Sequence, residues 1–461
     1  PFVGASRNTP SPLGYLFSID TSSPTSANYY TRYPNTLTTL IITDCEKISS
    51  SFTYDYESSS KNNLRTIILP FGNDYQSNNK YLPEIPGDIE FGKYSLTTIG
   101  ANAFSYSRTD SMYIPASVTT IGSNVFGSCS GTGAAEGIKE FYANNNVLGV
   151  AMFSHCKNLT KVQIDNVTVI PNEAFYGCTS LKNINKTNNG SGVNIFDTQV
   201  TSIGARAFYG ATNFMYPVED YENSKLEEIG ASAFYKCVNF GGVTTKVTPA
   251  EVDSEGNITT PEKTEVTQNE LIMHLPKGLK SIGCAAFYGA TAITEIYMYN
   301  QIESLGSTKY AKNVEGIFMG LTRLKKFVSE ANILDECMFM NDTTLEHVEI
   351  NNVSEIPQYS FKGTTNLKLI SANSVTTINS HAFDGANQLT TVNMQQLITL
   401  GDYVFNDCTS LKAVDMQNLI TIGAYAFYNC SSLTDVDMRC VETIGNSAFY
   451  GNDSLVEFKK F

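Results

Sequence analysis

The sequence predicts an α/β or mainly-β repeat solenoid, because one phenylalanine recurs along the chain at a regular interval. It follows a small or β-branched residue near the string I-G/P-x-x-A-F, and from Phe339 to Phe449 it recurs every 22 residues. We expect these side chains to stack in one column through the core. The series comprises Phe104, Phe126, Phe153, Phe175, Phe208, Phe234, Phe287, Phe318, Phe339, Phe361, Phe383, Phe405, Phe427 and Phe449.

The elements of one repeat follow from its apolar pattern. A clean unit, LKAVDMQNLITIGAYAFYNCSSL, runs from Leu411 to Leu433. Its first part alternates apolar Leu411, Val414 and Met416 with polar residues, which predicts a half-buried strand. A turn and a second, shorter inward edge follow. Gly423 then precedes the repeat phenylalanine, and we expect it to permit a sharp bend of the backbone.

A unit of this size cannot bury its apolar face alone, so stacked copies must form one continuous core. The template predicts about fifteen coils of roughly 22 residues between Leu37 and Phe458. With strands about 4.8 Å apart, they would form a curved rod about 70 Å long with a strand-lined concave face. We assign 1–36 to an N-terminal cap or tether and 37–461 to the repeat domain, with a polar insertion near 241–270.

Composition excludes several classes of function. The chain carries 45 acidic and 31 basic side chains, a net charge of −14. This balance disfavours nucleic acids and anionic membrane surfaces, which attract clustered cations. The longest apolar runs, such as Leu40-Ile41-Ile42, are far shorter than the roughly 18 residues that a membrane span needs, so we expect no membrane insertion. A hydrophobic content of 42% argues against disorder.

The repeat motif resembles a known family. Units read L-x-x-V/I-x-I/M followed by V/L-x-x-I-G-x-x-A-F-x-x-C over roughly residues 37–458, with Pro171 and Pro357 in place of the glycine in two units. This pattern resembles the BspA-like, or Treponema-type, leucine-rich repeats of bacterial surface proteins. The resemblance implies an extracellular or cell-surface protein used in adhesion or ligand recognition, and it supplies no catalytic motif. The glycines at the shared offset are Gly122, Gly204, Gly230, Gly283, Gly423 and Gly445.

Cysteines occupy a fixed place three residues after the repeat phenylalanine. We expect a buried column of free thiols there, because alanines such as Ala211 fill the same place in other units. Stacked pairs at bridgeable separation leave a disulfide as the alternative. The spacing fits neither zinc nor a Cys–His nucleophile, so we expect no metal and no catalytic residue. The column comprises Cys129, Cys156, Cys178, Cys237, Cys408 and Cys430.

Outward residues of the first strand are free to encode recognition, because the repeat determines the inward ones. Tyrosines there could anchor a partner. The acidic end of the face is expected to be solvated; the alternative is a weak Ca²⁺ or cationic-partner site formed by Asp415, Asp435 and Asp437. The predicted binding residues are Tyr142, Tyr297, Tyr299, Glu349, Asn393, Asp415, Asp435 and Asp437, and Ser371 belongs to the same central column.

The sequence thus favours a non-enzymatic scaffold that presents its strand face to a protein or glycan of a host or neighbouring cell. A solenoid offers an extended surface rather than a deep pocket. The alternative is a structural spacer with no ligand of its own, which would show a polar, featureless face. An enzyme would need convergent polar groups in a pocket, for example at the 238–273 insertion. We expect a monomer without a cofactor.

Overall fold

The computed structural model describes residues 37–42, 45–50, 52, 65–69, 95–105, 107–127, 137–143, 146–185, 195–248, 251–252, 258–260, 263–306, 315–415 and 417–459. The predicted cap or tether at 1–36 lies outside them. The chain divides into two compact units. Unit 1 contains residues 1–236, 276–287 and 301–311, and unit 2 contains residues 237–275, 288–300 and 312–461.

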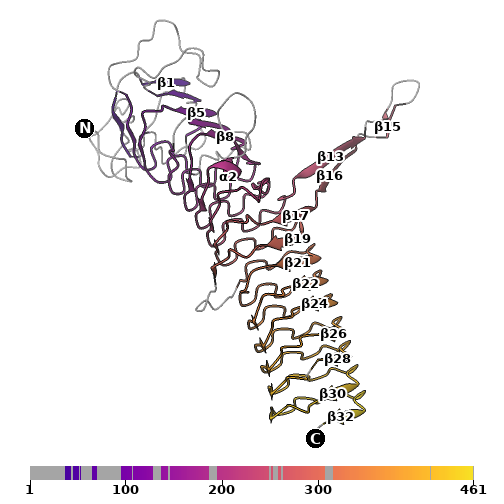
Figure 1. Cartoon of the computed structure of the whole chain (residues 1–461). Helices are drawn as coiled ribbons and strands as arrows, with labels where there is room; N and C mark the ends of the chain where they lie inside the picture. The colour runs from indigo at the N-terminus through magenta and orange to yellow at the C-terminus, as the bar shows by residue number, and fades with distance from the viewer. Residues whose placement is uncertain are drawn as a thin grey trace, which may run out of the picture. The chain divides into compact units, whose positions relative to one another are not determined.

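The described residues of unit 1 form three parallel sheets whose strands come from successive coils (Figure 1). The first is ordered β1 (Thr39–Ile41), β3 (Thr66–Ile68), β5 (Ser111–Ile114), β7 (Glu140–Ala143), β8 (Lys161–Ile164) and β10 (Ile184–Asn185). The second is ordered β20 (Ser304–Leu305), β18 (Ser281–Ile282), β12 (Glu228–Ile229), β11 (Ser202–Ile203) and β9 (Val169–Ile170), and the third β2 (Lys47–Ile48), β4 (Thr98–Ile99) and β6 (Thr120–Ile121). One short helix, α2 (Ile195–Thr198), is described.

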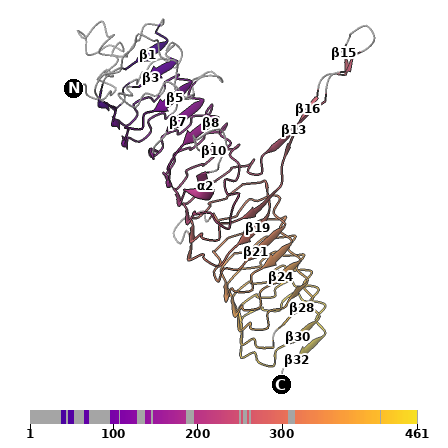
Figure 2. The ribbon, with the colours of Figure 1, turned by 45° about the horizontal axis from the view of Figure 1, so that its top comes forward.

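Unit 2 is also built from parallel strands of successive coils. Figure 2 shows the first strand of each coil lying beside that of the next. One parallel sheet is ordered β17 (Leu271–His274), β19 (Ile293–Met298), β21 (Lys326–Ser329), β22 (His347–Glu349) and β24 (Leu369–Ser371). It is followed by the pairs β26 (Thr391–Val392) with β28 (Ala413–Val414) and β30 (Asp435–Asp437) with β32 (Glu457–Lys459). The second strands form the sheet β23 (Glu355–Ile356), β25 (Thr377–Ile378), β27 (Thr399–Leu400), β29 (Thr421–Ile422) and β31 (Thr443–Ile444).

Among the described residues of unit 2, antiparallel pairing lies in the segment expected to hold the insertion. β13 (Val243–Thr248) pairs with β16 (Lys263–Gln268), and β14 (Glu251–Val252) pairs with β15 (Ile258–Thr260). At the base of this ribbon, Arg323 donates to the backbone oxygen of Gln268 at 3.3 Å and pairs with Glu270 at 3.1 Å. The repeat coil that carries Arg323 therefore anchors the ribbon.

The repeat phenylalanines stack in file, as the sequence predicts. In unit 1 neighbouring rings from Phe104 to Phe287 lie 5.3 to 5.5 Å apart between centroids. In unit 2 the rings from Phe318 to Phe449 lie 5.2 to 5.7 Å apart. The rings up to Phe427 are fully buried. The solenoid prediction is confirmed, in its mainly-β form.

The role expected for the repeat glycine was wrong. Gly423 does not adopt a positive φ, so the bend does not require glycine there. A Cβ on Gly423 would instead lie 2.3 Å from the backbone of Gly401 in the preceding coil, and one on Gly445 would lie 2.2 Å from the backbone nitrogen of Ala424. Glycine is therefore needed because adjacent coils approach too closely for a side chain.

The sharp turn comes two residues before the repeat phenylalanine, where non-glycine residues adopt left-handed backbone angles. Tyr403 has φ 56° and Tyr425 has φ 57°. A left-handed conformation costs an ordinary residue about 1–2 kcal/mol. Hydrogen bonds between coils offset this cost: the nitrogen of Tyr403 donates to the oxygen of Ala424 at 2.9 Å, and that of Phe405 to Ala426 at 2.8 Å.

The predicted burial of the cysteine column is confirmed for its described members. Cys156, Cys178, Cys237, Cys408 and Cys430 are fully buried and form no disulfide, and Cys129 lies outside the described residues. The thiol of Cys430 donates to the backbone oxygen of Phe405 at 3.1 Å, and Cys156, Cys178 and Cys408 make the equivalent bond. The column thus supplies a hydrogen-bond donor to the phenylalanine of the preceding coil.

Asp342 occupies the cysteine place of its coil and gives a testable pH dependence. Its side chain is buried; Oδ1 accepts a hydrogen bond from the nitrogen of Leu321 at 3.1 Å, and Oδ2 has no partner among the described residues. Burial raises the pKa of Asp342 well above its usual range, while the backbone amides of Leu321 and Gly320 act in the opposite direction. We therefore expect Asp342 to remain protonated in the folded protein at pH values where the unfolded chain is ionised.

Between those two pKa values the unfolded state binds fewer protons, so the free energy of unfolding should fall as pH rises above about 4. Asp342→Asn should remove this part of the slope, because the amide is neutral and can donate as Asn452 does to Phe427. Urea unfolding of wild type and Asp342→Asn at a series of pH values measures this slope. Burial raises the pKa of Asp335 to about 6. Because Asp335 is present in both proteins, it contributes equally to the pH dependence of their free energies of unfolding. Identical slopes would contradict the assignment.

Candidate recognition face

Outward residues of the sheet β17-β19-β21-β22-β24 form two ordered rows. Strand register places His274 opposite Tyr297, Tyr297 opposite Val328, and Val328 opposite Glu349. The row continues through Ser371 to Asn393, which pairs with it in an isolated bridge. One row therefore contains Tyr297, Glu349, Ser371 and Asn393. Val328 lies between Tyr297 and Glu349 in this row.

Three neighbouring side chains hold Tyr297 in place. Its ring stacks on His274 with centroids 4.6 Å apart and planes at 10°. Its hydroxyl donates to Oε2 of Glu295 at 2.8 Å, and Nζ of Lys326 lies 5.6 Å from the ring centroid. Lys326 also pairs with Glu349 at 3.5 Å. The ring is thus pre-oriented on a half-buried face.

Tyr299 completes this group through His274. Its hydroxyl lies 3.0 Å from Nδ1 of His274, and the two rings stack with centroids 6.5 Å apart. Burial lowers the pKa of His274, with Glu295 acting in the opposite direction. The hydrogen bond to Glu295 raises the pKa of Tyr297, and burial adds to this shift. We call His274, Glu295, Tyr297, Tyr299, Lys326 and Glu349 the Tyr297 patch.

The same local arrangement occurs in unit 1 around Tyr142. Its hydroxyl donates to Glu140, and Nζ of Lys161 lies 4.9 Å from its ring centroid. Glu140 pairs in register with Lys161, just as Glu295 does with Lys326. Tyr142, however, is only 6% exposed, so it offers little surface to a partner.

Two carboxylates at the acidic end of the predicted face already have hydrogen-bond partners. No group of three His, Cys, Asp or Glu side chains that could hold a metal occurs in the described part of the chain, which includes Asp415, Asp435 and Asp437. Arg439 pairs with Asp437 at 2.6 Å. Asp437 also accepts from the nitrogen of Arg439, and Asp415 from that of Gln417, both at 3.2 Å. These two carboxylates therefore cap turns after their strands, and the weak calcium site stays a prediction.

The predicted binding residues omitted His274, Glu295 and Lys326, which position the tyrosines. Glu295 lies two residues before Tyr297 on the same strand, which places both on one face. Lys326 begins a strand that follows the repeat template, in Leu324-Lys325-Lys326-Phe327. His274 ends the strand after the insertion, where the spacing is irregular, so its place beside Tyr297 required the structure.

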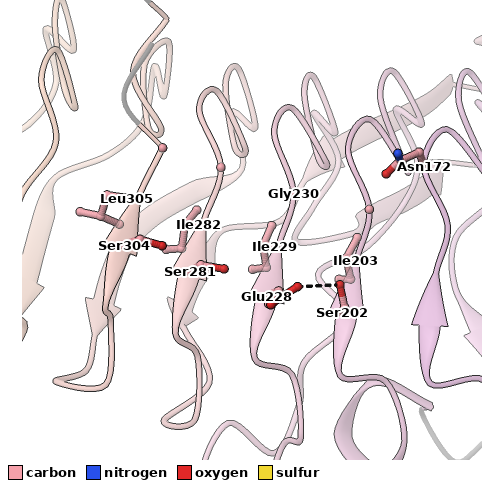
Figure 3. A pocket seen from close by; sticks show the side chains of 13 residues that line it. Asn172, Ser202, Ile203, Glu228, Ile229, Gly230, Ser281, Ile282, Ser304 and Leu305 are labelled. Atoms are coloured by element: carbon pink, nitrogen blue, oxygen red, sulfur yellow. Dashed lines mark hydrogen bonds between the residues drawn. The ribbon is translucent and has the colours of Figure 1, made fainter. Parts of the chain in front are cut away.

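Unit 1 also contains an open groove of about 440 Å³ (Figure 3). Strands β11, β12, β18 and β20 and the glycine that follows each of them line it, with Asn172 at one end. Ser202 donates to Oε2 of Glu228 at 3.3 Å. Glu228 is the one titratable side chain among the lining residues.

The parallel coils, the stacked phenylalanine column and the strand-lined face define a leucine-rich repeat protein. The chain belongs to the BspA type leucine rich repeat family, whose model, with six copies, matches residues 97–195, 187–255, 262–319 and 331–456. The predicted resemblance is confirmed. No curated protein matches the chain. In the described residues no helix is long and apolar enough to cross a bilayer.

Solved structures similar to this chain are bacterial repeat proteins. A leucine-rich repeat protein from Bacteroides ovatus is 20% identical, with a TM-score of 0.42, over 80% of this chain and 93% of that one. A leucine rich cell surface protein from Faecalibacterium prausnitzii is 21% identical, with a TM-score of 0.31, over 72% and 86%. The pneumococcal vaccine antigen PcpA is 16% identical, with a TM-score of 0.30, over 84% and 91%.

Proposed function

We propose that the protein is a non-enzymatic binding scaffold, located outside the cell or on its surface, that binds a protein or glycan of a host or neighbouring cell through the Tyr297 patch. The observation that carries the proposal is the contiguous group of aromatic rings on the strand face. A spacer would need no such group. Here Tyr297 and Tyr299 both contact His274, and charged neighbours surround them.

The patch has the physical properties of a recognition site. Tyrosine combines a large apolar ring with a polar hydroxyl, and it is enriched among residues that dominate binding energy. Because Glu295, His274 and Lys326 already hold the ring of Tyr297, little side-chain entropy would be lost on binding. Ile272, 53% exposed, and Leu369, 49% exposed, lie in the adjacent row and add apolar contact area.

We also propose the domain boundaries that the repeat pattern indicates. Residues 37–461 form the repeat domain that presents the face, the polar segment near 241–270 is an insertion in it, and residues 1–36 cap or tether it. The protein acts as a monomer without a cofactor. Asn393 and Glu349 extend the face beyond the tyrosines, and Asp415, Asp435 and Asp437 form its acidic end. Light scattering after size-exclusion chromatography measures the oligomeric state.

Arrays of host matrix proteins and glycans test the proposal. The double variant Tyr297→Ala/Tyr299→Ala should weaken binding of the retained ligand at least about tenfold, because truncating anchor residues typically costs more than 1 kcal/mol each. Tyr209→Ala, a half-buried tyrosine of unit 1, serves as the matched control and should bind as the wild type does. Circular dichroism confirms that the variants remain folded.

Two outcomes would contradict the proposal. If the folded wild-type protein retains no ligand on either array, the structural spacer is favoured. If the double tyrosine variant binds as tightly as wild type, recognition lies elsewhere on the chain. An Asp415→Asn/Asp437→Asn variant tests whether the acidic end of the face contributes to binding. We expect it to weaken binding less than loss of the two tyrosines does.

A further inference from the structure

A column of aromatic rings runs along a corner of unit 2, separate from the Tyr297 patch. It contains Tyr359, His381, Tyr403 and Tyr425, each two residues before a repeat phenylalanine and each with a left-handed backbone. Neighbouring ring centroids lie 5.1, 4.8 and 4.7 Å apart. All four side chains are partly exposed, so solvent reaches the ring edges.

Tyr403 and Tyr425 are the one pair of consecutive tyrosines in this column. Their planes are at 9°, and the residues are separated by one repeat of 22 positions. Rings that stack face to face at this distance can meet as phenoxyl radicals without diffusing together. Formation of the bond between them then requires the two ring edges to rotate toward one another. The hydrogen bond from the nitrogen of Tyr403 to the oxygen of Ala424 holds the two coils at this spacing.

The thiols of the cysteine column beside these rings are shielded. The chain has no tryptophan. Cys408 and Cys430 are fully buried, and their thiols donate to the backbone oxygens of Phe383 and Phe405. Burial raises the pKa of Cys430 to about 12, so its reactive thiolate is scarce. Cys440 is exposed and is the competing thiol in this part of the unit.

We propose that Tyr403 and Tyr425 form an oxidative modification site at which a one-electron oxidant joins consecutive coils through a dityrosine bond. A haem peroxidase with hydrogen peroxide is the class of reagent that supplies the chemistry. Each phenol loses one electron and one proton to give a phenoxyl radical. The radicals couple through ring carbons ortho to oxygen, and loss of the ring protons to the oxygens restores two phenols. The two electrons and two protons reduce one hydrogen peroxide to two waters.

Such a bond would act as a covalent link between coils. Disulfides commonly serve this purpose, but the described thiols of the cysteine column are buried and bonded to backbone oxygens. Linking residues one repeat apart restricts the unfolded chain by closing a loop, which raises the free energy of unfolding. The linked protein should therefore melt at a higher temperature than the untreated protein.

The experiment treats dilute full-length protein, alkylated at Cys440, with horseradish-type peroxidase and limiting hydrogen peroxide. Mass spectrometry of proteolytic fragments should detect the peptide of Tyr403 joined to that of Tyr425, lighter by two hydrogen atoms than their sum. Dityrosine fluorescence should appear while the protein remains monomeric on a denaturing gel. Tyr403→Phe and Tyr425→Phe should each abolish the joined fragment, because phenylalanine preserves stacking but lacks the phenol.

Tyr359→Phe is the matched control, since Tyr359 occupies the same left-handed place but stacks on His381. It should leave the joined fragment unchanged. The proposal is overturned if treated wild-type protein shows no joined Tyr403–Tyr425 fragment, or joins these residues only between molecules. It is also overturned if the fragment forms equally in urea-unfolded protein, since stacking would then be irrelevant to the coupling.

Discussion

Replacing Phe405 with alanine should lower the free energy of unfolding by about 3–5 kcal/mol. The ring is fully buried and stacks on Phe383 and Phe427, with centroids 5.5 Å away on each side. Truncation leaves a cavity that the rigid coils above and below cannot close, because their backbones are bonded from coil to coil. Urea unfolding followed by circular dichroism measures the loss.

Phe449→Ala is the matched control for this substitution. Phe449 lies at the same place of the repeat and stacks on Phe427 at 5.2 Å, but it is only partly buried. Its truncation should therefore cost less than that of Phe405. Equal denaturation midpoints for wild type and Phe405→Ala would show that the column does not carry the stability of this unit.

Gly423→Ala should also destabilise unit 2, by about 3 kcal/mol or more, at the upper end of the cost of overpacking. The added Cβ would lie 2.3 Å from both the carbonyl carbon and oxygen of Gly401. These are backbone atoms of the neighbouring coil, so no side-chain rotation relieves the overlap. Thermal unfolding monitored by circular dichroism measures the change.

A different glycine provides the control for this prediction. Gly385 has φ 80°, and a Cβ there would meet nothing closer than 3.8 Å. At the equivalent place in other coils, Asn341 and Asn429 adopt positive φ values of 64° and 57°. Gly385→Asn should therefore be close to neutral. If Gly423→Ala were equally harmless, close approach of the coils would not be the reason for glycine at that place.

The sequence predicted the columns of the fold because a fixed interval brings the same side chain to the same place in every coil. The phenylalanine stack and the buried thiols both follow from spacing alone. The reason for glycine did not, because the clash arises between atoms of different coils. From one repeat the bend suggested a flexible backbone, whereas the structure places the left-handed residues two positions away, at Tyr403 and Tyr425.

The candidate site was only partly predictable for a related reason. Tyr297, Tyr299 and Glu349 could be named from strand alternation, which determines the face on which a side chain lies. Their partners could not all be named, because His274 and Tyr297 become neighbours only when the chain returns from the insertion into register. The acidic residues looked alike in sequence, but the structure shows Asp437 paired with Arg439 and Asp415 bonded to the nitrogen of Gln417.

The amino-acid sequence by itself determined that this protein is a stack of repeated coils with a phenylalanine core and an outward strand face. A periodic chain has one way to bury periodic apolar groups, which is to place them over one another. Only the tertiary structure decided which side chains of that face meet, which carboxylates cap turns and which tyrosines stack. Those contacts depend on distances between coils of a few ångströms, and no interval along a single chain encodes such distances.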